Sequence, residues 1–270
     1  MKQQYKALIV DTILKEIRSK TLIVILVLTT VATYFGHLIV KYFTSEQELE
    51  GLSVAVAGGT LASSFWLLNL IAFSIATIFG VSVLRSDIQT KIIYQYLTFP
   101  INRMEYFLSR VTGIWLLVLG YYLYSYILNL VLLSSAYGEF LFSMKYLLTF
   151  GVLAVYLLIV IFIAIFFSLL LNKIGTLFIV FLLGIISSAS FNTFKNVSLL
   201  ESVQDLGIIK IVGLIVYYLF PRISFLTDVS NSLIFGQEIS YNVIGQVAHL
   251  IISCVVYVYL AFFMLKKKDF

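Results

Sequence analysis

Two histidines, His37 and His249, are the side chains in the long apolar stretches of the sequence that could move a proton near neutral pH. An ionisable group at membrane depth is costly and is usually kept for function. A lone histidine is nevertheless more often a packing or hydrogen-bonding residue than a catalyst. Asn69, Asn129 and Gln246 are also polar, but amides carry no protons and commonly bond one helix to another. The sequence therefore favours neither an intramembrane enzyme nor an ion-coupled carrier.

Nucleotide and metal motifs are missing from the sequence. A phosphate-binding GxxxxGK[ST] loop needs a glycine followed by lysine, and none of the 15 glycines has one. The chain also has no HExxH motif, and its one cysteine, Cys254, allows no disulfide framework or Cys/His cluster. We expect no catalytic residue, cofactor or metal in this chain, so ATP and magnesium, if they are used, must bind to another subunit.

Composition indicates the environment in which the helices must lie. Of the 270 residues, 61% are apolar and 11% are charged, and the mean hydropathy is +1.04. Soluble domains have roughly 45–50% apolar and about 25% charged residues. With two prolines and no biased tract to form a linker, residues 1–270 are expected to be a single membrane domain.

Six uncharged stretches are long enough to cross roughly 30 Å of hydrocarbon as helices. They predict an all-α integral membrane protein with spans at 21–40, 54–84, 111–136, 146–171, 174–191 and 243–265. The run at 211–221 is too short to span, and it is expected to lie at the interface or dip into it.

The basic residues predict the orientation of these spans. With six spans, 13 of the 18 Lys and Arg residues fall on the face that carries both termini. The positive-inside rule then places both termini in the cytoplasm. Since the pI near 9.1 follows from this orientation, we expect no nucleic-acid partner.

The N-terminal segment has the pattern of an amphipathic helix. Tyr5, Leu8, Ile9, Ile13 and Ile17 recur at helical spacing before the first span. We expect this helix to lie on the inner leaflet of the membrane, as an anchor or in a functional role.

The cytoplasmic loop 85–110 is too long and too apolar for a simple connection between two spans. Asp87 and Lys91 are spaced as an i,i+4 ion pair. Apolar residues recur at helical spacing at Ile88, Ile92, Ile93, Tyr96 and Leu97. Pro100 ends this predicted helix, and Asn102 can cap a second helix that leads into the third span. The loop therefore predicts a helix–break–helix elbow.

In this loop the sequence resembles the permease subunits of ABC-2 type transporters. The family pattern is matched in order by Asp87, Tyr96, Leu97, Pro100, Ile101, Asn102, Arg103, Glu105 and Tyr106. The segment 15–20 resembles the family's elbow before the first span, and the KKKDF ending resembles its basic tail. The sequence departs from the pattern at Lys91 and Ile92, where a Gly-Thr step is common, and at Arg110, where lysine is frequent.

The resemblance implies a coupling helix that docks on a cytoplasmic ATP-binding subunit, which holds the ATP and magnesium. The coupling residues would be Asp87, Ile88, Ile92, Tyr96, Leu97, Pro100, Arg103 and Glu105. It further implies a second permease copy or paralogue, export as the direction of transport, and the bacterial cytoplasmic (inner) membrane as the location. A non-transporting scaffold or assembly factor that docks a partner through the same loop is the alternative.

Two further features have two interpretations each. In the external segment 192–242, Pro221 is either a gate element, as in similar permeases, or part of a re-entrant packing segment. Small residues recur every four positions at Ala72, Ala76 and Gly80, and again at Gly184 and Ser188. Such stripes allow close helix approach, either within the bundle or between subunits.

Overall fold

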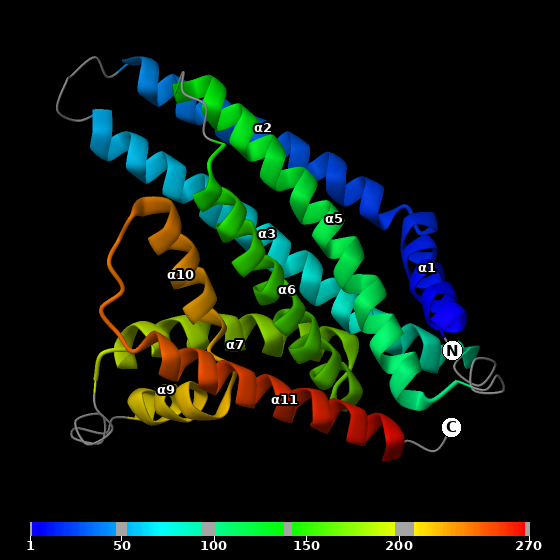
Figure 1. Cartoon of the computed structure of the whole chain (residues 1–270). Coiled ribbons are helices and arrows are strands. Elements are labelled where there is room, and N and C mark those ends of the chain that lie inside the picture. The colour runs from blue at the N-terminus through cyan, green and yellow to red at the C-terminus, as the bar shows by residue number, and fades with distance from the viewer. Residues whose placement is uncertain (1, 47–52, 93–100, 138–141, 198–207, 268–270) are drawn as a thin grey trace.

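The computed structural model describes residues 2–46, 53–92, 101–137, 142–197 and 208–267, and all the regular structure in these ranges is helical (Figure 1). The helices are α1 (Lys2–Arg18), α2 (Thr21–Glu46), α3 (Ser53–Gln89), α5 (Arg103–Tyr137), α6 (Met144–Leu170), α7 (Lys173–Phe194), α9 (Ile208–Leu219), α10 (Ile223–Phe235) and α11 (Val243–Lys267). The protein is therefore a helical bundle, as the sequence predicts.

Each of the six predicted spans coincides with one long helix of the bundle. In the described part of the chain, five helices are long and apolar enough to cross a membrane by themselves. The sixth, α2, passes the same test together with α1, from which it is bent by 65°. A second bent pair, α9 and α10, meets at 84°. By length and composition, the described residues therefore offer between five and seven candidate spans.

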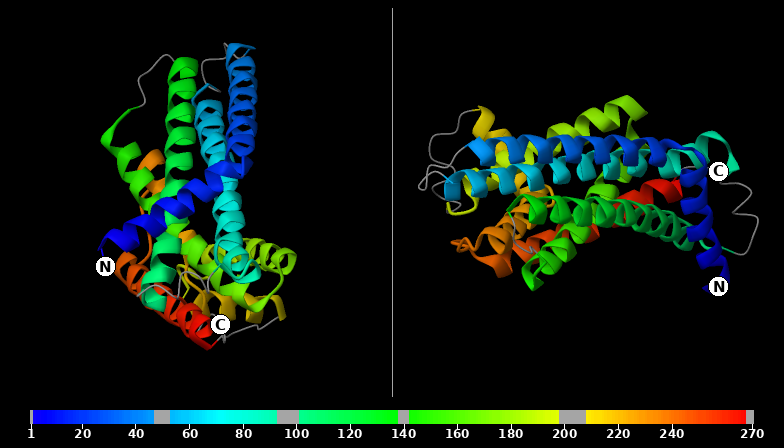
Figure 2. Two further views of the ribbon diagram at one scale, coloured as in Figure 1. Left: turned by 90° about the vertical axis from the view of Figure 1, so that its right-hand side faces the viewer. Right: turned by 90° about the horizontal axis from the view of Figure 1, so that it is seen from above.

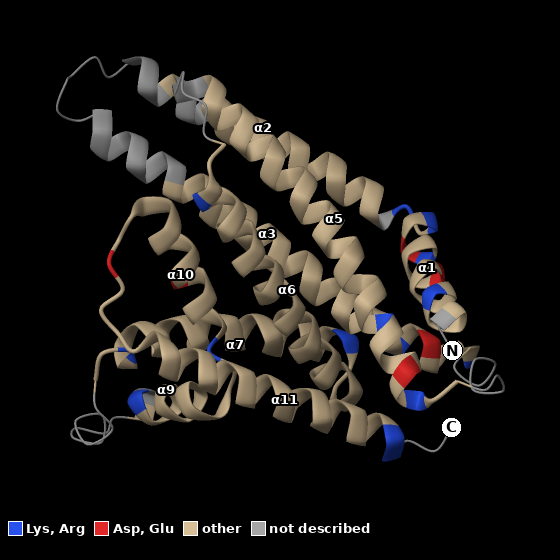
Figure 3. Cartoon of the chain, viewed as in Figure 1, with Lys and Arg blue, Asp and Glu red and all other residues tan. Residues whose placement is uncertain are grey.

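Charge and chain direction distinguish the two ends of the bundle. α1 begins and α11 ends at the same end of the molecule, where α3 also ends and α5 begins (Figure 1). Most of the described Lys and Arg residues gather at this end, which we call the basic end (Figure 3). α9 begins and α10 ends at the opposite end, so this pair turns back within the bundle (Figure 1).

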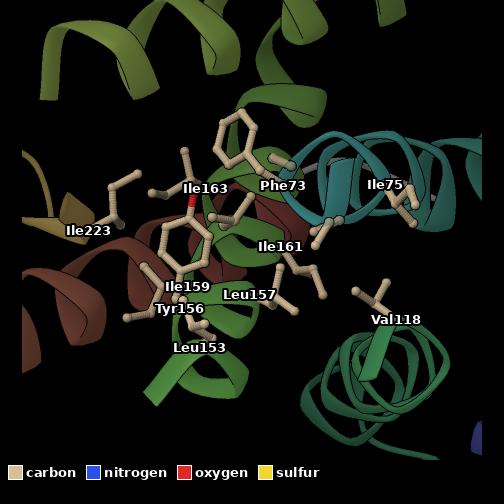
Figure 4. Packing of buried hydrophobic residues seen from close by; sticks show 14 of the residues in the cluster. Phe73, Ile75, Val118, Leu153, Tyr156, Leu157, Ile159, Ile161, Ile163 and Ile223 are labelled. Carbon is tan, nitrogen blue, oxygen red and sulfur yellow. The ribbon is translucent and has the colours of Figure 1, made fainter. Parts of the chain in front are cut away.

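α6 is the central helix of the bundle, and α3 packs closely along it (Figure 4). Ala72 and Ala76 are buried, and a Cβ atom added at Gly80 would lie 2.9 Å from Ala164 Cβ. The stripe of small residues on α3 thus serves packing inside the bundle. On α7, Gly184 faces Phe73 in the same way, whereas Ser188 is exposed.

α1 lies across the basic end of the bundle and packs on α5 (Figure 2). Its contact face carries Leu8 and Thr12, which are buried, and a Cβ at Gly113 would meet Thr12 Cβ at 2.7 Å. Tyr5 also shares a 3.0 Å hydrogen bond with Thr112. The predicted amphipathic helix exists, and its buried face packs on α5. Its opposite face is left for contact with lipid.

Candidate functional site

The residues that the sequence places at the start of the coupling loop belong to α3. This helix continues through Asp87 and Ile88 to Gln89, and Lys91 then adopts a left-handed backbone with φ of 58°. The predicted helix from residue 88 is therefore wrong at its beginning, because the chain breaks at residues 90–91. Ile92 follows this break, and Tyr96, Leu97 and Pro100 lie outside the described residues.

Asp87 is buried at the basic end, with 1% of its surface exposed. Its Oδ1 accepts a 2.7 Å hydrogen bond from Lys15 Nζ on α1. Its Oδ2 accepts a 2.6 Å bond from the hydroxyl of Tyr106 and lies 2.9 Å from Arg110 Nε. Asp87 therefore does not face a partner protein, and its ion partners come from two other helices, not from the next turn of α3.

Arg110 extends this network from α5 to α1. Its Nη1 donates to Asp11 Oδ2 at 2.9 Å and to Thr12 Oγ1 at 2.7 Å. The guanidinium also lies 5.4 Å from the ring centre of Tyr106. We call this group the Asp87 cluster. Its members are Asp11, Thr12, Lys15, Ser86, Asp87, Tyr106 and Arg110.

Glu16 lies beside the Asp87 cluster on α1. Burial raises the pKa of its carboxyl, and the positive charge of Lys15 acts in the opposite direction. The cluster joins the two helices that flank the loop, α3 and α5, to α1, which is far from both in the sequence. A buried, paired carboxylate and guanidinium fix the geometry of such a junction, because breaking the pair leaves an unbalanced buried charge.

Arg103 and Glu105 occupy the first turn of α5. Glu105 accepts a 3.3 Å hydrogen bond from the backbone N–H of Asn102, so Asn102 stands at the N-cap as predicted. Arg103 Nη1 donates at 3.0 Å to the carbonyl of Lys266 in the last turn of α11. Both predicted coupling residues thus take part in contacts within the chain that hold the end of the loop.

Ile88 and Ile101, on either side of the loop, are half-buried and pack against the hydrophobic core. Ile92 is also partly buried. The apolar residues on either side of the loop therefore attach its two described ends to the bundle.

Pro221 is buried at the break between α9 and α10. With Phe220 and Ile223 it lines a small apolar cavity, whose other walls come from the middle of α3, α6 and α7. The end of the 211–221 run therefore lies inside the bundle. Its expected place at the membrane interface stays a prediction. The gating role of Pro221 stays a prediction.

Arg222 follows Pro221, and the sequence does not predict that its side chain is buried. Its Nε donates to Tyr217 O at 3.0 Å, and its Nη1 donates to Gln246 Oε1 at 2.7 Å. One signal in the sequence could have indicated this burial. The arginine follows a proline at the end of an apolar run that is too short to span the membrane. His249 lies nearby and bonds to Tyr218 O at 2.9 Å, in the hydrogen-bonding role expected of it.

Among the described residues, no group of three or more His, Cys, Asp and Glu side chains could hold a metal ion. No protein-family model matches the chain, and no curated protein matches it.

Proposed function

We propose that this chain is the membrane-spanning permease subunit of an ATP-binding cassette exporter. It is driven by ATP hydrolysis in a separate cytoplasmic subunit, which docks on the loop between α3 and α5. The proposal rests on the ordered ABC-2 motifs of this loop and is supported by six long helices at the predicted places. The left-handed backbone of Lys91 adds support, because it favours glycine, the residue common at this position in the permeases that the loop resembles.

The structural observation that adds most to these motifs is the Asp87 cluster. Three helices meet at the base of the loop through a buried carboxylate–guanidinium pair, and Lys15 joins α1 to the same carboxylate. A loop that only anchors the chain has no need of such a junction. A loop that transmits force needs one, because a push on the loop then moves α1, α3 and α5 together.

In the proposed mechanism, ATP closes the two partner subunits, and their approach displaces the docked loop. The Asp87 cluster transfers this displacement to α1, α3 and α5, and the Arg103 bond to Lys266 carries it to α11. The bundle then rocks and changes the side from which its interior is accessible. Asp87 acts here as a positioning residue, since it is buried. Ile92, Tyr96 and Leu97 provide the apolar contact, and Pro100 shapes the loop.

A test begins with purification from native membranes in mild detergent and identification of every co-purifying chain. We expect a stoichiometric soluble subunit with a phosphate-binding loop and ATPase activity. The double variant Tyr96→Ala/Leu97→Ala should reduce its recovery at least tenfold. The control is Glu238→Ala, an exposed residue in the connection between α10 and α11 at the opposite end of the bundle. It should leave recovery unchanged.

Recovery of the chain without an ATPase, under conditions that preserve other such complexes, would reject the proposal. A scaffold or assembly factor could dock the same partner, so vesicle reconstitution must follow. ATP-dependent movement of a cargo supports the permease, whereas a stable complex that hydrolyses ATP without moving any cargo favours the scaffold.

A further inference from the structure

Arg222 is a buried cation inside the bundle. It is 9% exposed and lies at the break between α9 and α10. Its neighbours Phe220, Pro221 and Ile223 line a cavity formed with residues from the middle of three long helices. A charge at this depth in a membrane protein is costly and points to a functional role.

The contacts of Arg222 hold the guanidinium without neutralising it. In the described ranges, no carboxylate lies within ion-pair distance of it, whereas Lys15, Arg110 and Lys195 each have one. The guanidinium lies 3.8 Å from the ring centre of Tyr217, which orients a cation through the face of its ring. The positive charge is thus available to a group that the chain does not supply.

The hydrogen bonds of Arg222 leave one of its nitrogens available. Nε donates to Tyr217 O and Nη1 donates to Gln246 Oε1. Within the residues that the structure describes, the two N–H groups of Nη2 have no acceptor. Gln246 is itself fixed, because its Nε2 donates to Tyr217 OH at 3.2 Å. The side chain is therefore held in place with two donors unused, which is the arrangement that binds an oxyanion.

The two helices that contact Arg222, α9 and α11, carry apolar side chains on the outer surface of the bundle. Tyr218 on α9 is 39% exposed, and on α11 Val247 and Ile251 are 38% and 58% exposed. The ring centre of Tyr218 lies 5.5 Å from the guanidinium, and Val247 follows Gln246, which accepts the bond from Nη1. Both helices therefore carry exposed apolar side chains next to the residues that hold the arginine. Helix faces exposed in this way within a membrane bundle meet acyl chains.

We propose that Arg222 binds the oxyanion of an amphiphile, with the phosphate of an anionic phospholipid as the ligand that its surroundings favour. The headgroup phosphate contacts Nη2, and the acyl chains lie along the exposed apolar residues of α9 and α11. The site goes beyond the proposed transport function, since binding requires neither ATP nor the ATPase subunit. A free phosphate compound has the same oxyanion but lacks the chains.

The test uses the purified full chain and measures binding of dihexanoyl phosphatidylglycerol, dihexanoyl phosphatidylcholine and glycerol 3-phosphate. We expect phosphatidylglycerol to bind at least tenfold more tightly than the other two. Arg222→Gln should remove this preference, and Arg222→Lys should keep most of it. The control Lys195→Gln removes a cation that is already paired with Asp228, and it should change the preference less than twofold.

Each other outcome of this experiment has a definite meaning. Equal binding of phosphatidylglycerol to the wild type and to a folded Arg222→Gln variant overturns the proposal. Tight binding of glycerol 3-phosphate that needs Arg222 supports the oxyanion site and makes its ligand a soluble one.

If Arg222→Gln does not fold, the wild type can be labelled with a photoreactive phosphatidylglycerol and mapped by mass spectrometry. Labels on residues 215–222 and 244–251 support the site. Labels confined to other segments overturn it.

Discussion

Arg110 Nε lies 2.9 Å from Asp87 Oδ2, and the side chains of these two residues are 2% and 1% exposed. They come from α5 and α3, on opposite sides of the loop that resembles a coupling helix. The pair therefore closes the base of the loop. Breaking such a buried pair from one side typically destabilises a protein by about 3–5 kcal/mol, whereas replacing both partners with apolar residues is often nearly neutral.

Asp87→Asn should lower the free energy of unfolding by about 3 kcal/mol, because Arg110 then keeps a buried charge with less compensation. The measurement is equilibrium unfolding in detergent micelles. Asp11→Asn is the control, since Asp11 also binds Arg110 but its side chain is 49% exposed, so the loss should stay below about 1 kcal/mol. The double variant Asp87→Leu/Arg110→Met should recover most of the stability, and equal losses in Asp87→Asn and Asp11→Asn would contradict this assignment.

Lys91→Gly should raise the free energy of unfolding by about 1 kcal/mol, because a left-handed backbone is strained for residues with a Cβ atom. The side chain of Lys91 is exposed, so its removal loses few contacts. The matched control is Gln89→Gly two residues earlier, at the last residue of α3, which is exposed and has no left-handed backbone. This change should lower stability by less than about 1 kcal/mol. Changes of the same sign in both variants would rule out the backbone explanation.

Gly80→Ala should destabilise the protein by about 1–3 kcal/mol, because the new methyl group would overlap Ala164 Cβ and lie 3.2 Å from the carbonyl of Ile161. Gly151→Ala on α6 meets nothing within 4 Å and should be neutral or slightly stabilising. Thermal unfolding of both variants checks the contrast. Adding Ala164→Gly to the first variant should restore part of its loss, and failure to do so would place the strain elsewhere.

Gly113→Val should displace α1 from α5, because a Cβ at residue 113 would lie 2.7 Å from Thr12 Cβ. The measurement is maleimide labelling of Thr12→Cys in a Cys254→Ser background, which removes the native thiol. We expect labelling to rise at least fivefold when Gly113→Val is added. Gly120→Val on the same helix has open space around it and should leave labelling unchanged. Slow labelling in both combinations would mean that α1 stays docked.

The six long helices could be predicted from the sequence because the length of an apolar run is a local property. The partners of Asp87 could not, since the spacing rule pointed to Lys91 and the ion partners are Lys15 and Arg110 from other helices. The left-handed backbone at Lys91 then ends the helix that local periodicity would have continued. Long-range charge pairing thus decided the geometry at the base of the loop.

Arg222 shows the same limit at the other half of the bundle. The sequence indicated a run too short to span, but whether its end lay at the surface or within the bundle depended on α3, α6 and α7. Their side chains surround Phe220 and Pro221, and an arginine that would be counted as an external cation is buried. The fold class could be read from composition, whereas the depth of this residue required the tertiary structure.

The hydrogen bond from Arg103 Nη1 to the carbonyl of Lys266 joins residues that are 163 positions apart. α5 is synthesised well before α11, so the first turn of α5 lacks this contact until the end of the chain has been made. Only after α11 has been inserted does its last turn supply the acceptor. The basic end of the bundle therefore reaches its final arrangement late in biogenesis. In a chain that has not yet inserted α11, the end of the loop lacks its contact with that helix.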